Sequence, residues 1–213
     1  ILTDEYLRTG LAGTSVALST GATVSAGSDG SFTFTKVPTE TYTVTQTLVA
    51  GYGTHDQLTK PLEVTAGKIT TVSLTQFKYV SIYGYVTNSI DDSPLSGVRV
   101  DLSGGASGTY VTDSSGLYKF SNIDPSLTYT VTLVTSTLPL NWASYGPTTV
   151  TLNNLLSDYP SDTQVNFKAY PLPLMLFEKI ADKVKVVPGD YITDTIYYDN
   201  IGPGPAKDVN IKD

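Results

Sequence analysis

Histidine is the side chain best suited to moving protons near neutral pH, and this chain contains one, His55. It lies in a glycine-containing stretch, residues 51–56, beside Asp56. A catalytic triad would need its imidazole to face a nucleophilic serine, but the sequence has no Gly-x-Ser-x-Gly turn that would expose one. We therefore interpret His55 as a solvated loop residue and expect the chain not to be an enzyme.

Carboxylates suggest a second kind of chemistry, metal binding. Asn88, Asp91 and Asp92 lie close together in one predicted loop, and Asp4 and Glu5 lie in the corresponding loop of a similar, earlier segment. Calcium takes roughly six to eight oxygen ligands, several of them from carboxylates. So short a loop offers few, which favours a plain polar turn. A calcium ion held by the first three residues is the alternative, and no other cofactor is expected.

Composition excludes further classes of function. The net charge is −7 and only two residues are arginine, so the chain lacks the clustered positive charge that a nucleic-acid partner requires. It contains no cysteine, which rules out thiol chemistry and cysteine-held metals. No apolar run approaches the length of a membrane-spanning helix, so no membrane insertion is expected in this segment.

The most informative pattern is an internal repeat. Residues 10–45 resemble residues 94–132, with loop insertions between the matching positions. The matching pairs are Leu11 and Leu95, Gly13 and Gly97, Val16 and Val100, Leu18 and Leu102, Gly30 and Gly116, Phe32 and Tyr118, Phe34 and Phe120, and Tyr42 and Tyr129. Both copies contain short alternating segments bounded by glycine or proline turns, and these predict β-strands, including one through each aromatic pair.

This spacing predicts an all-β chain of tandem β-sandwiches, immunoglobulin-like or transthyretin-like. We expect three domains, at residues 1–77, 78–170 and 171–213. The first should lack its opening strand, which the second has at residues 79–86. The proline-rich stretch 171–173 should be a stiff junction, and the last segment should be only the front part of a third domain.

The pattern Leu-x-Gly-x-x-Val-x-Leu, followed by Gly-x-Tyr/Phe-x-Phe and Tyr-Thr-Val-Thr, resembles the Cna-B and SdrD-B-like domains of bacterial surface proteins and the carboxypeptidase-regulatory-like domains. The final segment, with Pro-Gly-Asp and Asn-x-Gly-Pro-Gly-Pro-Ala, resembles the opening of the surface repeat called domain of unknown function eleven. Cna-B-like domains can carry a Lys–Asn isopeptide bond. The resemblance points to Lys78 and Asn166 as the pair and Asp101 as the assisting acid; the favoured alternative is Lys78 as a solvated strand-edge charge.

These features favour a structural spacer, stalk or assembly module of an extracellular prokaryotic surface protein, such as an adhesin, an S-layer-associated protein or a surface filament. A glycan- or protein-binding module, with a stripe of exposed tyrosines, is one alternative. A fibre subunit that assembles by strand donation is another. Expected partners are other domains of the same longer chain and, in the fibre alternative, copies of itself. We favour completion of the end domains by the same chain, because a missing half-domain exceeds what one donated strand can replace.

Overall fold

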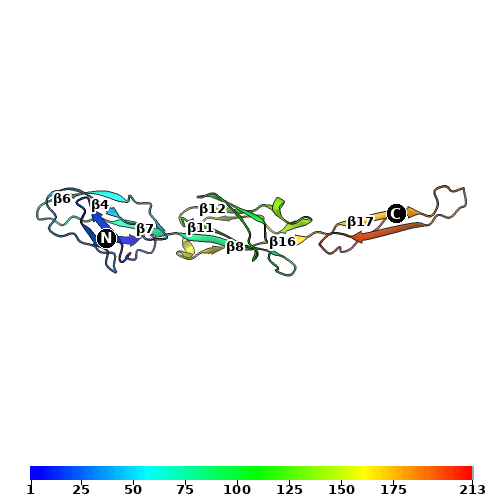
Figure 1. Ribbon diagram of the computed structural model, residues 1–213, viewed down its shortest axis with the longest axis horizontal. Helices are drawn as coiled ribbons and strands as arrows, with labels where there is room; N and C mark the ends of the chain where they lie inside the picture. Colours follow the sequence, from blue (N-terminus) through cyan, green and yellow to red (C-terminus); the bar gives the residue numbers. More distant parts are fainter. Residues whose placement is uncertain (213) are drawn as a thin grey trace. The chain divides into compact units, whose positions relative to one another are not determined.

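The computed structural model describes residues 1–212, and its regular structure is almost entirely β, as the sequence predicts (Figure 1). Contact density divides the chain into two compact units. The first contains Ile1–Ile82 with the segments Phe120–Thr128 and Asn153–Thr163, and the second contains the remainder. The division passes through three strands, near residues 82, 120 and 163, so it differs from the boundaries expected from the repeat.

Two sheets form the first sandwich. Its seven strands are β1 (Leu2–Asp4), β2 (Ser15–Leu18), β3 (Thr23–Ser25), β4 (Glu40–Gln46), β5 (Tyr52–Gly53), β6 (Thr59–Val64) and β7 (Leu74–Lys78). One sheet has the order β3-β2-β4-β6 and the other has the order β1-β7-β5. Alternation along β4, where Tyr42, Val44 and Gln46 are buried and the threonines between them are exposed, turns one face of the first sheet toward the core.

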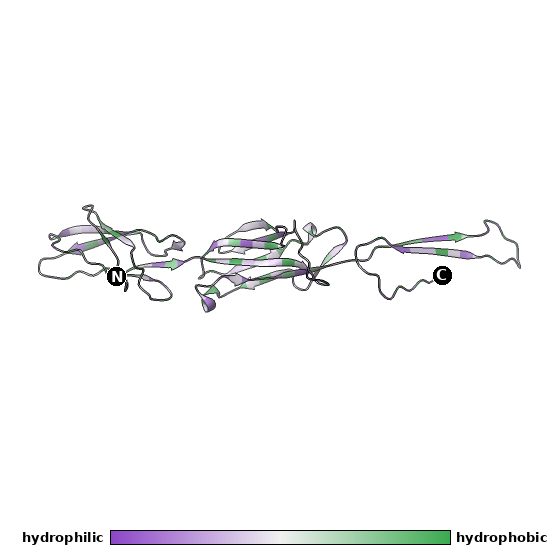
Figure 2. Cartoon of the chain, turned by 60° about the horizontal axis from the view of Figure 1, so that its bottom comes forward, coloured by the Kyte–Doolittle hydropathy of each residue, from purple (hydrophilic) through white to green (hydrophobic). Residues whose placement is uncertain are grey.

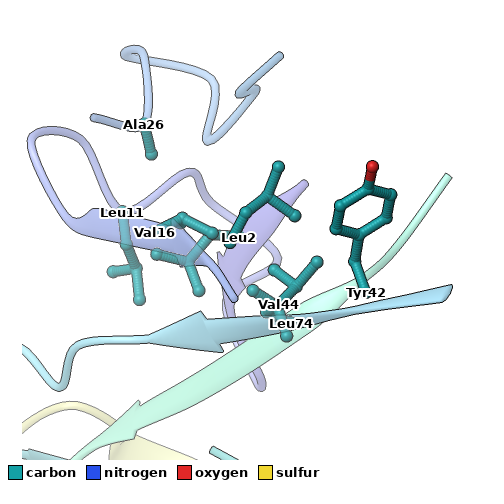
Figure 3. Packing of buried hydrophobic residues seen from close by; sticks show 8 residues of the cluster. Leu2, Leu11, Val16, Ala26, Tyr42, Val44 and Leu74 are labelled. Carbon is teal, nitrogen blue, oxygen red and sulfur yellow. The ribbon is translucent and has the colours of Figure 1, made fainter. Parts of the chain in front are cut away.

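The core of the first sandwich lies between these sheets. Leu2, Val16, Val44 and Leu74 are fully buried, and Figure 3 shows them converging from four different strands. Tyr42 buries its ring in the same cluster and donates its hydroxyl hydrogen to the carbonyl of Pro38, 3.1 Å away. Burial of each such aliphatic side chain contributes about 1.5–3 kcal/mol to the stability of the sandwich.

The second sandwich also has two sheets. Its strands are β8 (Val80–Asn88), β9 (Arg99–Gly104), β10 (Gly108–Val111), β11 (Leu117–Ile123), β12 (Tyr129–Leu133), β13 (Trp142–Tyr145), β14 (Thr149–Leu152), β15 (Thr163–Gln164) and β16 (Phe167–Pro171). The orders are β10-β9-β12-β14 and β11-β8-β16-β13, with β15 pairing β8 beside β16. Tyr118 and Tyr129, which the repeat predicts to be core residues, are buried between the sheets.

The two copies share their turn hydrogen bonds as well as their strands. The amide of Gly13 donates to the carbonyl of Ala26 at 2.8 Å, and the matching bond from Gly97 to Thr112 is 2.9 Å long. The tight turn after β1 is repeated after β8, with a hydrogen bond of 3.0 Å from residue i+4 to residue i in each case. The repeat seen in the sequence therefore corresponds to one fold built twice.

One buried carbonyl shows how the copies compensate for different residues. In the first copy the hydroxyl of Thr14 donates to the carbonyl of Leu11 at 2.9 Å. In the second copy valine stands at the matching position, and the hydroxyl of Thr112, on the opposite chain segment, donates to the carbonyl of Leu95 at 2.6 Å. The same buried acceptor is thus satisfied from two different sides, because an unpaired one would cost about 1–3 kcal/mol.

Two features of the first sandwich differ from the expected strands. The opening strand is shortened rather than missing, because β1 matches the last three residues of β8. The strand predicted through Phe32 and Phe34 is wrong: this segment is irregular, although its counterpart in the second copy is β11. The physical reason is that β11 pairs with β8, whereas no strand within residues 1–212 lies beside residues 32–35 to pair with them.

The last segment forms a two-stranded antiparallel ribbon of β17 (Met175–Ala181) and β18 (Asp194–Asn200). Its turn at Gly202–Pro205 packs on the end of the second sandwich. A Cβ atom at Gly204 would lie 2.1 Å from the carbonyl oxygen of Pro171, so only glycine fits there. The expected junction at residues 171–173 is therefore tied by hydrogen bonds: Leu172 donates to the carbonyl of Asn141 and accepts from Gly204. Apolar residues recur along both strands of the ribbon (Figure 2).

Candidate functional site

The loop predicted as a possible calcium site uses its oxygens for its own turn. Asn88 accepts a hydrogen bond from the amide of Ile90 at 3.1 Å. Asp91 accepts from the amide and the hydroxyl of Ser93 at 3.0 and 2.7 Å. Asp92 forms an ion pair with Lys168 at 2.8 Å, so a cation from the protein already contacts this carboxylate. Within residues 1–212, no group of three or more His, Cys, Asp or Glu side chains is arranged to hold a metal ion.

We predict that removal of calcium leaves the stability of this loop unchanged. The turn is satisfied by the protein's own donors, and the hydrogen bonds from Ser93 lower the pKa of Asp91, so the carboxylate is stable without a metal. The measurement is the melting temperature with excess EDTA and with millimolar calcium. A calcium-dependent rise that disappears in the variant Asp91→Asn would contradict the prediction, because only binding to the folded state produces such a rise.

The three residues proposed for an isopeptide bond have separate surroundings. Lys78 is exposed at the end of β7 in the first unit. Asn166, in the second unit, accepts hydrogen bonds from the amide of Tyr85 and the side chain of Gln164. Asp101 lies on β9, where Arg99 binds both of its carboxylate oxygens at 2.7 and 2.8 Å. Arg99 lowers the pKa of Asp101, which disfavours the protonated form that would assist the bond.

The one histidine belongs to a charged cluster in the first unit. The Nδ1 atom of His55 lies 3.1 Å from a carboxylate oxygen of Glu5, and its Nε2 atom lies 2.6 Å from Asp124. The imidazole stacks on the ring of Phe77, with the ring centroids 4.4 Å apart and the planes inclined by 15°. A protonated imidazole donates through both nitrogens and can satisfy both carboxylates at once. Both ring nitrogens already contact carboxylates, so the imidazole has a structural role here.

The same unit contains a second polar contact with an aspartate. The hydroxyl of Tyr159 donates to a carboxylate oxygen of Asp4 at 2.7 Å and accepts from the amide of Lys78 at 2.6 Å. The other carboxylate oxygen of Asp4 caps the turn that follows β1 by accepting from the amides of Tyr6 and Leu7 at 2.9 Å. Asp4 is buried and is fully used by these hydrogen bonds, so it has a structural role.

The His55 cluster predicts a dependence of stability on pH. Desolvation alone would lower the pKa of His55, but the hydrogen bonds to Asp124 and Glu5 outweigh it and raise the pKa above the ordinary 6.5. The cluster therefore stabilises the folded state fully below about pH 6.5 and loses this effect as the pH rises through the higher pKa of the folded state. Because the side chain is 41% exposed, solvent screening limits the effect to about 0.5 kcal/mol.

The measurement is the unfolding free energy between pH 5 and pH 8 for the wild type and for His55→Gln. The variant should lose most of the decline seen between acidic and neutral pH. The ammonium group of Ile1 also titrates in this range, since desolvation lowers its pKa from 8.0, but it is common to both proteins. Identical pH profiles for the two proteins would contradict a charged His55.

Sequence reasoning missed this cluster for a simple reason. Glu5 and Asp124 lie 50 and 69 positions from His55, and no local pattern connects them. The one available signal was that the loop containing Glu5 matches the loop after β8, which places it at one end of the first sandwich. Nothing in the sequence identified Asp124 as its companion.

The first unit contains a groove of about 530 Å³ with many apolar lining residues. Its floor is formed by core residues of β2, β4 and β6, and its walls are formed by the irregular segments 32–37 and 68–72. Phe32, Phe34 and Val72 pack on the core but remain partly exposed along it. A groove bounded by two extended segments has the shape of a site for a third extended segment.

Comparison of the sequence with protein-family profiles finds no match, and comparison with curated proteins also finds none. Comparison of the fold finds partial similarity to several solved structures, pilins among them. A streptococcal ancillary pilin is 14% identical with a TM-score of 0.39; the match covers 80% of this chain and 61% of the pilin. The Bacillus anthracis TIE protein is 16% identical with a TM-score of 0.43, over 96% of this chain and 42% of that protein.

A shaft pilin from Lactobacillus rhamnosus GG is 12% identical with a TM-score of 0.39, over 76% of this chain and 85% of the pilin. This chain thus spans about three fifths of the ancillary pilin and two fifths of the TIE protein. At such low identity and TM-score, these similarities do not bear on activity. Within residues 1–212, no helix is long and apolar enough to cross a membrane.

Proposed function

We propose that this chain is a structural module, a spacer or assembly unit, of a protein displayed outside a prokaryotic cell. The observation that carries the proposal is that the same sandwich is built twice and that equivalent polar groups do the same structural work in both copies. The carboxylates and the histidine that could have taken part in catalysis or metal binding instead form turns, caps and ion pairs. A pilus subunit, a stalk of an adhesin and an S-layer-associated protein are forms of such a module.

The surface composition supports an extracellular role. Outward-facing positions of β4 and β12 are mostly threonine, and charged residues make up only 15% of the chain. Hydroxyl-rich β-surfaces remain soluble without many charges, and the structure uses no thiol that would depend on the redox state of its compartment. Among the described residues of the two sandwiches, each strand pairs with strands of its own sandwich, which suits a module that must stay folded while it carries load.

The test is localisation of the native protein in its source cells. Antibodies raised against residues 1–213 should label intact, unpermeabilised cells, and brief protease treatment of intact cells should remove the signal. A cytoplasmic protein of the same cells serves as the control for lysis. Labelling that appears only after permeabilisation would contradict the proposal that the chain is displayed outside the cell.

A further inference from the structure

The second sandwich pairs its opening strand directly with its closing strand. β8 and β16 are neighbours in one sheet and run parallel (Figure 1). The register joins Val86 with Phe167, Thr87 with Lys168 and Asn88 with Ala169. Because the strands are parallel, the start of β8 and the end of β16 lie at opposite ends of the pair. Tension along the chain therefore pulls the two strands past each other, along their common axis.

The backbone hydrogen bonds between these strands lie across that pull. At one end of the contact the amide of Val165 donates to the carbonyl of Tyr83 at 2.8 Å, and at the other the amide of Ser89 donates to the carbonyl of Ala169 at 2.8 Å. We call the bonds between residues 83–89 and 165–169 the central ladder. Bonds in a parallel ladder are evenly spaced, so sliding strains them together, whereas separation from one end breaks them one at a time.

The neighbouring strands also resist sliding. The sheet order is β11-β8-β16-β13, so neither β8 nor β16 is an edge strand. β16 pairs antiparallel with β13, where Tyr145 lies opposite Lys168 and Trp142 opposite Pro171. For β16 to slide past β8, it must also slide past β13, and β8 must likewise slide past β11.

Burial protects the central ladder from water. Val86 and Ala169 are 0% exposed, and Phe167 is buried beside them, so the core face of the ladder is dry. Water can replace a protein hydrogen bond only where it reaches the donor and the acceptor. On the outer face Lys168 forms an ion pair at 2.8 Å with Asp92, in the turn after β8. Both side chains are exposed, so this ion pair contributes little by itself.

The same pairing recurs in the first sandwich. There β1 runs parallel to β7, with Leu2 opposite Leu74. The amide of Glu5 donates to the carbonyl of Gln76 at 2.7 Å, at the place that the bond from Ser89 to Ala169 has in the second copy. The parallel ladder is thus part of the repeated fold and is not particular to one copy.

We propose that the central ladder is the force-bearing element of the second sandwich, strong against tension along the chain and weak against a pull across its end. This inference rests on the load-carrying role proposed above and identifies the strands that carry the load. The opposite sheet, β10-β9-β12-β14, connects to β8 and β16 only through loops, so it bears little force until the central ladder breaks.

The test compares two directions of pull on the same sandwich. The chain has no cysteine, so a pair of introduced cysteines sets the direction. Lys78→Cys with Pro173→Cys loads the central ladder along its axis, and Ile90→Cys with Pro173→Cys loads it across the end where Ser89 meets Ala169. All three changed positions are exposed. Each variant of residues 1–213 is held at constant force in an optical trap, after its melting curve has been matched to the wild type.

At the same force, unfolding should be at least about a hundredfold slower when the pull is along the ladder. The reason is that several hydrogen bonds, each contributing roughly a fivefold factor, must then break together. The rate of unfolding is the relevant quantity, because it governs forced unfolding. Equal rates in the two directions, or a slower rate for the pull across the end, would overturn the proposal.

A pair of core variants separates the ladder from stability in general. Val86→Ala lies in the central ladder and Val131→Ala lies on β12 of the opposite sheet, and both valines are 0% exposed. With the cysteines at 78 and 173, Val86→Ala should raise the unfolding rate under tension at least about tenfold, and Val131→Ala less than about threefold. The loss of stability of each variant in urea is followed by the fluorescence of Trp142.

An effect of Val131→Ala under tension as large as that of Val86→Ala would overturn the assignment of the force to the central ladder. The failure of this inference and the failure of the proposed function are distinguishable. Dependence on the direction of pull is a property of the purified chain, whereas the surface role is tested by labelling of intact cells. A direction-dependent rate without surface labelling would contradict only the proposed function, and labelling with equal rates would contradict only the force-bearing ladder.

Discussion

Replacing Gly84 by alanine should unfold the second sandwich under conditions in which the wild type stays folded. The new Cβ atom would lie 1.6 Å from the carbonyl oxygen of Val165 and 2.9 Å from the hydroxyl of Tyr118. The first of these is a backbone atom in the centre of the sheet, so relief requires β8 and β15 to separate. We expect a loss of about 3 kcal/mol or more, at the upper end of overpacking effects.

The reporter for this prediction is Trp142, the one tryptophan of the chain, which lies on β13 of the second sandwich. Its fluorescence transition should shift downward by about 12–24 °C, at roughly 4–8 °C per kcal/mol for a domain of this size. The matched control is Gly146→Ala, where φ is +91° and no atom lies within 4 Å of the new Cβ. That change should cost only about 1 kcal/mol. Equal losses from both changes would contradict the close approach at Gly84.

Replacing Tyr118 by alanine should cost the second sandwich about 3–5 kcal/mol, the range for a fully buried aromatic residue. Tyr118 is 0% exposed, packs on Phe167 with the ring centroids 6.3 Å apart, and donates its hydroxyl hydrogen to the carbonyl of Val165. Burial raises the pKa of the phenol, so it stays a donor at all ordinary pH values. Tyr118→Phe should cost only about 1–2 kcal/mol, since it removes the hydrogen bond and keeps the ring.

The counterpart Phe32 provides the matched comparison. Phe32→Ala should cost the first sandwich only about 1–2 kcal/mol, because this ring is half-exposed along the groove and less area returns to water on unfolding. The transition reported by Trp142 should not move. Unfolding by urea, followed by circular dichroism for the whole chain and by tryptophan fluorescence for the second sandwich, separates the two effects. Equal losses from Phe32→Ala and Tyr118→Ala would show that the groove is covered in solution.

The sequence alone predicts the fold well where matching positions of the two copies share both the alternation of apolar residues and the neighbouring strands. Tyr118 and Tyr129 are buried as expected, and Thr23–Ser25 and Gly108–Val111 form the short strands that the turn residues bracket. The same reasoning fails at Phe32, where the alternation is correct but no strand within residues 1–212 pairs with the segment. Pairing in a sheet depends on a neighbour that local pattern does not reveal.

The candidate sites were harder to predict for a related reason. The sequence predicts that the loop containing Asp91 is a polar turn or a calcium site. The structure shows a turn in which Ser93 donates to Asp91 and Lys168 forms an ion pair with Asp92. Calcium binding to this loop stays a separate prediction. The partners of His55 come from distant segments, so only the folded chain brings them together. The sequence also does not show that the buried carbonyl bonded by Thr14 in the first copy is bonded by Thr112 in the second. An alignment compares residue types at each position rather than the hydrogen bonds that they make.

The central claim is that this chain carries load as two separately folded sandwiches, and pulling single molecules of residues 1–213 from their two ends tests it most directly. We predict two separate unfolding steps that release about 25 nm and about 30 nm of chain, from about 0.34 nm for each extended residue of the first and second sandwiches. Gly84→Ala should weaken only the larger step. A single step that releases the whole length at once, or smooth extension without any step, would contradict the claim.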